Sequence, residues 1–186
     1  METENCFHIS LTGQIKSCYF PCGIDGNKLF CRYDIVAGAD WDLVSGISSG
    51  VTQLSRAGSR IEEIVFNMPL EVMYKSTNPF GWPQIIICLY GNNFWGAESS
   101  KGYARCHLPI TSGEIRAPIF QIKCSNIWSS LTTWFTDRNP ELRNPKILVE
   151  GEKTKGLCVE SYGDVVIATQ SITRGGADLM LDWGQR

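Results

Sequence analysis

The amino-acid sequence predicts an all-β protein, an antiparallel sandwich of about eight strands with one short helix in a late connection. Three observations support this fold class. Apolar residues recur with a period of two, glycine or proline separates most of these segments, and only one stretch has helical spacing. The chain has 186 residues, of which 43% are hydrophobic and 19% charged, as is typical of a globular protein with one core.

The first half of the chain contains the clearest alternation. Apolar residues occupy every second position over 7–11, and a looser alternation follows over 29–36. We expect two further strands, at 64–66 and 70–74, because the asparagine and proline within 67–69 interrupt the pattern.

The second half begins with an uninterrupted apolar run from Ile85 to Tyr90. Such a run predicts a central strand that is covered on both faces. The segments 103–108 and 165–172 complete the predicted set, and weaker candidates lie near Val51 and Leu148.

One stretch has a helical pattern. Ser125 and Asn126 can cap a helix, and apolar residues then recur at helical spacing until Pro140 and Pro145. Those apolar residues are Ile127, Leu131, Trp134 and Phe135. The helix is expected to pack through its aromatic side chains, and the alternative is that it docks a partner.

The chain contains no internal repeat and no linker, so we predict a short lead at 1–5, one domain at 6–175 and a short tail at 176–186. The apolar tail either docks on the sandwich or contacts a partner. The acidic start resembles no secretory signal, and no apolar run is long enough to span a bilayer. A soluble, intracellular protein is therefore expected.

The charge and the cysteine content argue against nucleic-acid binding, a disulfide framework and a zinc site. There are 17 Lys and Arg residues against 19 Asp and Glu, so the net charge of −2 provides no field for nucleic-acid binding. The eight cysteines are spread evenly, and without a signal sequence we expect reduced thiols, with Cys88 buried as a small hydrophobe. Cys18 and Cys22 lack the second pair that a zinc site requires, so no metal is expected there.

The sequence offers little for catalysis, and we expect no enzyme and no cofactor. A nucleophile–base pair would have to place His8 or His107 in a cleft beside a thiol or hydroxyl. No phosphate-binding loop, dinucleotide fingerprint or nucleophile elbow is found. The only Asp-x-Asp, Asp40 to Asp42, supplies too few carboxylates for a calcium site.

The segment Lys75–Ile85, Lys-Ser-Thr-Asn-Pro-Phe-Gly-Trp-Pro-Gln-Ile, resembles the signature of the B9-domain family. Further blocks resemble the family in order, so that the resemblance covers nearly the whole chain. These blocks are Thr12–Ile15, Leu29–Tyr33, Gly38-x-x-Trp41, Gly46–Gly50, Tyr90–Gly91, Gly102–Tyr103, His107–Pro109, Trp134–Phe135 and Arg138–Glu141.

The resemblance implies a C2-type sandwich without calcium ligands and a non-enzymatic structural role at the ciliary transition zone. Its implied partners are sibling B9-domain proteins and the Meckel-syndrome and tectonic module, which supports ciliogenesis and the ciliary membrane diffusion barrier. The implied location is the cytoplasm at the cilium base, near the basal body and cytoskeleton. The alternative is a calcium-independent phospholipid-binding module with peripheral membrane contact.

The signature residues are the candidate site. Pro79 and Pro83 fix backbone dihedrals on either side of Gly81 and Trp82, so we interpret the segment as architectural, with a partner contact as the alternative. The residues included are Lys75, Ser76, Thr77, Asn78, Pro79, Gly81, Trp82 and Pro83. Phe94 and Trp95 are separate candidates for a loop-tip contact with a membrane or a partner.

Overall fold

The computed structural model describes residues 6–19, 28–57, 63–92, 96–123, 141–149 and 158–175. These residues form antiparallel strands and one short 3₁₀ helix, so the predicted all-β class is confirmed. The elements are β1 (Phe7–Tyr19), β2 (Lys28–Val36), β3 (Trp41–Gly46), β4 (Ser49–Val51), β5 (Ser55–Arg56), β6 (Glu63–Ser76), β7 (Gln84–Asn92), β8 (Glu98–His107), β9 (Gly113–Lys123), η2 (Pro145–Leu148) and β10 (Cys158–Gly175).

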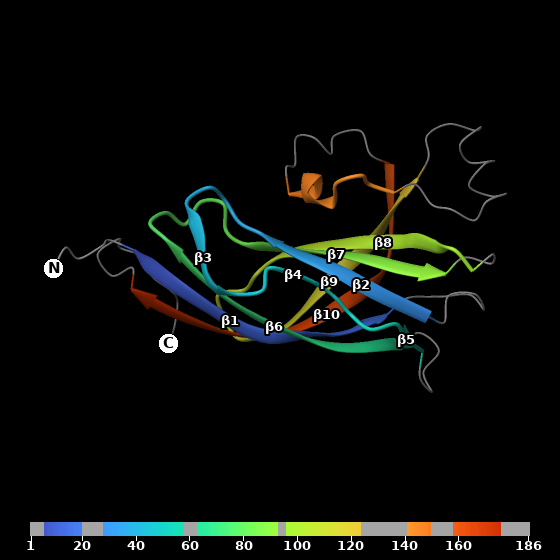
Figure 1. Cartoon of the computed structure of the whole chain (residues 1–186), viewed down its shortest axis with the longest axis horizontal. Helices are drawn as coiled ribbons and strands as arrows, with labels where there is room; N and C mark the ends of the chain where they lie inside the picture. The colour runs from blue at the N-terminus through green and yellow to red at the C-terminus, as the bar shows by residue number, and fades with distance from the viewer. Residues whose placement is uncertain are drawn as a thin grey trace.

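The strands form one hydrogen-bonded sheet that folds over into two layers. Its order is β3-β6-β1-β10-β9-β8-β7-β2-β4, and β5 pairs with β2. The long strand β10 joins the layers, because Cys158–Thr169 pairs with β9 while Asp164–Gly175 pairs with β1. In Figure 1, β1, β6 and β10 lie below β2, β7 and β8. Strands β8 and β9 are paired through two residue pairs in the described structure, so the hydrogen-bonded contact between them is short.

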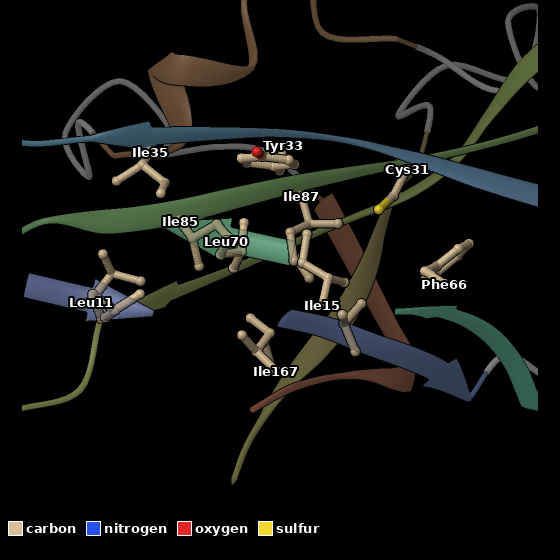
Figure 2. Close-up of a cluster of buried hydrophobic side chains, with 14 of the residues drawn as sticks. Leu11, Ile15, Cys31, Tyr33, Ile35, Phe66, Leu70, Ile85, Ile87 and Ile167 are labelled. Carbon is tan, nitrogen blue, oxygen red and sulfur yellow. The ribbon is translucent and has the colours of Figure 1, made fainter. Parts of the chain in front are cut away.

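The main core lies between the layers, where alternate side chains of each strand meet. Leu11, Ile15 and Ile167 from one layer face Ile85 and Ile87 from the other (Figure 2). All five are at most 1% exposed, which confirms the predicted alternation of the first strand and the burial of the central one.

Strand β7 is covered on both faces, as predicted. Its other face contributes Ile86, Cys88 and Tyr90 to a second buried cluster, together with Leu148 from η2. In Figure 1 the orange η2 segment lies above β7 and β8. The segment is held by polar contacts as well, since the Tyr90 hydroxyl donates to Glu141 Oε1 at 2.8 Å. Burial raises the pKa of the Cys88 thiol to about 12, consistent with its predicted role as a small hydrophobe.

Several sequence expectations need correction. The predicted break at 67–69 is absent, because Asn67 adopts a φ of 48° and β6 continues through a bulge opposite β1. Leu148 lies in η2 and not in a strand, since Asn144 caps this turn and Pro145 begins it. Strands β3, β5 and β9 were not predicted, and the described residues contain ten strands, of which β4 and β5 are very short.

Other predictions lie outside the described residues. These are the helix within 125–140, the loop-tip residues Phe94 and Trp95, the lead at 1–5 and the tail at 176–186. In the part of the chain that is described, Cys6, Cys18, Cys31, Cys88, Cys106 and Cys158 are in no disulfide.

Candidate interaction surfaces

The signature segment forms the connection from β6 to β7, and its polar residues build a tight turn. The Asn78 backbone N–H donates to Ser76 Oγ at 3.1 Å, and the Phe80 N–H donates to Asn78 Oδ1 at 3.0 Å. Asn78 Nδ2 also donates to Asp40 Oδ2 at 3.2 Å, and the Ser76 hydroxyl donates to the Asp40 carbonyl at 2.8 Å. These contacts join the β6–β7 connection to the β2–β3 connection.

Two glycines let the same two connections approach closely. The Gly38 N–H donates to the Gly81 carbonyl at 2.8 Å, and Gly81 has a φ of 68°. A Cβ atom on Gly81 would lie 2.6 Å from the Gly38 Cα. Glycine at 81 is therefore required both by the backbone conformation and by the space available.

The tryptophan of the signature closes this end of the core. The Trp82 ring packs edge-on against Trp41, with ring centroids 5.2 Å apart, and Trp41 packs in the same way against Phe7 at 5.3 Å. Trp82 Nε1–H donates to the Leu108 carbonyl, and Trp41 Nε1–H donates to the Phe80 carbonyl, both at 2.7 Å. These contacts support the architectural interpretation, which stays a prediction.

The flanking signature residues differ in exposure. Pro83 is buried and Lys75 is partly buried, whereas Thr77 and Pro79 are exposed. Phe80 was not among the predicted site residues. Its side chain is 79% exposed, although its backbone N–H and carbonyl are both hydrogen-bonded. The turn thus holds the backbone of an aromatic residue whose ring faces solvent. Phe80 could have been identified from the sequence as a large apolar residue between Pro79 and Gly81, because these two residues predict a turn.

A second surface, which we call the edge surface, comprises the exposed side chains of Leu43, Ile47, Val51 and Leu54. They lie on β3, on β4 and next to these strands, which are the two ends of the sheet order. Ile47 is the most exposed of them, at 68%. Within the described residues β3 pairs only with β6 and β4 only with β2, so each has one side without a strand partner.

The two histidines differ in their surroundings. His107 is exposed at the end of β8. His8 lies with Cys6 and Ser10 in the lining of a hollow on the outer face of β1.

The described ranges contain no group of three His, Cys, Asp or Glu side chains placed to hold a metal ion. Asp40, from the single Asp-x-Asp, is instead bonded to Asn78 as described above. No helix in the same ranges is long and apolar enough to cross a membrane.

The two-layered antiparallel sheet places the chain in the class of C2-type β-sandwich proteins. Residues 9–172 match the family B9-C2, described as ciliary basal body-associated B9 protein. The chain therefore belongs to the B9 family of ciliary proteins, as the signature predicted.

Individual relatives agree with this assignment. B9 domain-containing protein 1 of Drosophila melanogaster is 44% identical over 97% of this chain and 79% of its own length. The human protein of the same name is 32% identical over 98% of this chain and 89% of its own length. B9 domain-containing protein 2 of Danio rerio is 25% identical over 82% of this chain and 87% of its own length. A solved structure of a C2 domain from plant extended synaptotagmin 1 is also similar, with a TM-score of 0.44 at 8% identity, covering 88% of this chain and 92% of that one.

Proposed function

We propose that this chain is a non-enzymatic structural subunit of a protein complex at the ciliary transition zone. In this proposal it binds sibling B9-domain proteins and, with them, Meckel syndrome protein 1 and the tectonic module. The complex supports ciliogenesis and the diffusion barrier between ciliary and plasma membranes. Membership of a family described as basal body-associated supports the location.

The observation that carries the proposal is the edge surface. Strands β3 and β4 each present one side without a strand partner in the described structure, and the short connection through Ile47 joins them. A strand added to such an edge satisfies backbone N–H and carbonyl groups, while apolar side chains such as Leu43 and Val51 supply the buried area. We infer that a sibling domain binds here through an extended apolar segment.

A second contact is proposed at Phe80. The backbone of Phe80 is already ordered by its two hydrogen bonds, so binding costs little backbone freedom, and exposed aromatic side chains often anchor protein interfaces. Asp40 and Asp42, both exposed, lie in the neighbouring connection and the start of β3. This acidic setting favours a protein partner over an anionic membrane surface.

Calcium-independent phospholipid binding is the alternative function. It would use exposed cations, but the Lys16 Nζ lies 2.6 Å from Glu114 Oε1, and the Lys146 Nζ lies 3.3 Å from Asp34 Oδ1. These pairs reduce the field that an anionic lipid would experience. The assembly function is therefore the one we propose.

The test is to mix the purified chain with its two sibling B9-domain proteins in EDTA and to measure complex mass by light scattering. We expect a stable hetero-complex without calcium. The double variant Leu43→Asp/Ile47→Asp should lose the complex, whereas Val159→Asp should retain it, because Val159 is a half-exposed valine of β10, in the middle of the sheet order and away from β3 and β4.

A folded wild-type chain that stays monomeric and binds neither sibling protein would contradict the proposed assembly. Salt-sensitive binding of that monomer to anionic vesicles would then establish the phospholipid alternative. A complex that forms equally well with the edge variant would place the interface elsewhere.

A further inference from the structure

The outer face of the β3-β6-β1-β10 layer carries a hollow of about 560 Å³. Three apolar side chains in its lining, Val44, Met73 and Ile172, come from three different strands. The register places them in one row, because Ser10 of β1 is opposite both Met73 and Ile172, and Val44 lies at the bulge beside Met73. Ile172 is 69% exposed and Val44 is 51% exposed, so this apolar row faces solvent in the described structure.

A charged row lies next to the apolar one. Asp42, Lys75, His8 and Arg174 are successive cross-strand neighbours in the register. The row contains two permanent cations and one carboxylate, so a ligand that combines apolar with acidic side chains would match both rows.

The chain itself supplies such a ligand directly after the hollow. Gly175 is part of the lining, and the residues that follow it are Gly-Ala-Asp-Leu-Met-Leu-Asp-Trp-Gly-Gln-Arg. Four large apolar residues, at 179–181 and 183, lie next to the acidic residues Asp178 and Asp182. Six residues span at most about 20 Å, so Leu181 is within reach of a hollow that begins at Gly175.

We propose that residues 176–186 bind in this hollow of the same chain. Their apolar side chains cover Val44, Met73 and Ile172, and their aspartates lie near Lys75 and Arg174. The binding removes from water an apolar row that the described residues leave exposed. The hollow lies on the outer face of the β3-β6-β1-β10 layer and contains none of the four edge-surface residues, so the proposal goes beyond the proposed assembly function and does not depend on it.

The test measures hydrogen–deuterium exchange of residues 176–186 in the full-length chain, with light scattering on the same samples. In the monomeric wild type we expect these amides to exchange more slowly than an unstructured peptide. The variant Ile172→Asp should speed their exchange by roughly tenfold, because it removes the most exposed apolar wall of the hollow. Arg174→Glu should speed it by a smaller factor, since it reverses one charge of the row.

Val159→Asp is the matched control, since Val159 is a half-exposed valine on the same strand but remote from the hollow. It should leave the exchange of 176–186 unchanged. Exchange of the wild-type segment at the rate of an unstructured peptide would overturn the proposal. So would protection that is insensitive to Ile172→Asp, or protection that appears only where light scattering detects a dimer, in which case a second copy fills the hollow.

Discussion

Two regions of the sandwich are built in opposite ways. One is the end that contains the signature segment, and the other is the open edge formed by β3 and β4. At the signature end, Asn78, Gly81 and Trp82 are joined to neighbouring segments by hydrogen bonds with Asp40, Gly38 and Leu108, respectively. At the open edge, four large apolar side chains face solvent, and each strand has one side without a strand partner in the described structure. The two regions are neighbours in the chain, since β3 begins with Trp41 at the signature end.

This difference separates stability from binding. Residues whose contacts are already satisfied within the chain contribute to folding, and their loss lowers the free energy of unfolding. Residues that are apolar and exposed contribute little to the isolated domain and gain contacts only when a partner arrives. The following predictions test this separation, beginning with the largest expected effect on stability.

The largest effect is expected for Trp82→Ala. The substitution removes the ring that packs on Trp41 and the hydrogen bond to the Leu108 carbonyl, so it should destabilise the domain by about 3 kcal/mol or more. Urea unfolding followed by circular dichroism measures this value. A variant with an unchanged unfolding midpoint that has lost partner binding would show that Trp82 is an interface residue and not an architectural one.

A smaller effect is expected for Gly81→Ala, at about 2 kcal/mol, because alanine is strained at a positive φ and its Cβ would meet the Gly38 Cα. Gly113→Ala is the matched control, since Gly113 has open space around its position and no positive φ. Thermal unfolding of the two variants compares them directly. Equal melting temperatures would mean that the two connections separate without cost.

The sequence predicted one of these regions far better than the other. The signature end was recognisable because its constraints are local: proline and glycine fix the backbone wherever they occur. Strand β7 was predicted for a similar reason, since a run that is apolar at every position must be covered on both faces. The edge was not predicted, because Leu43 and Ile47 resemble core residues in sequence, and their exposure follows from which strand lies beside them.

Two of the missed strands, β3 and β9, were missed for distinct physical reasons. In β3 only Trp41 is buried, so no alternation of apolar and polar residues could identify the strand. In β9 the buried residues Ala117 and Ile119 do alternate, but Pro118 lies between them. That proline is tolerated because it sits beside the register shift between β9 and β10.

Asn78→Ala tests the polar part of the signature end. It removes the acceptor of the Phe80 N–H and the donor to Asp40, and should cost about 1 kcal/mol because both groups left behind remain partly accessible to water. Thr77→Ala, at the exposed neighbouring residue, should change the stability much less. Urea titrations of both variants provide the comparison, and a larger loss for Thr77→Ala would contradict the assignment of the turn contacts.

The smallest effect on stability is expected at the open edge and at the tip of the turn. Ile47→Lys and Phe80→Ala each change a mostly exposed side chain, so the free energy of unfolding should stay within about 0.5 kcal/mol of the wild-type value. Binding to a sibling B9 domain should nevertheless weaken at least tenfold for each variant, as is typical of a central anchor residue. Isothermal titration of the folded variants measures this affinity. If Ile47→Lys instead unfolds the domain while its binding per folded molecule is unchanged, then the edge is part of the fold, and the separation drawn between the two regions is wrong.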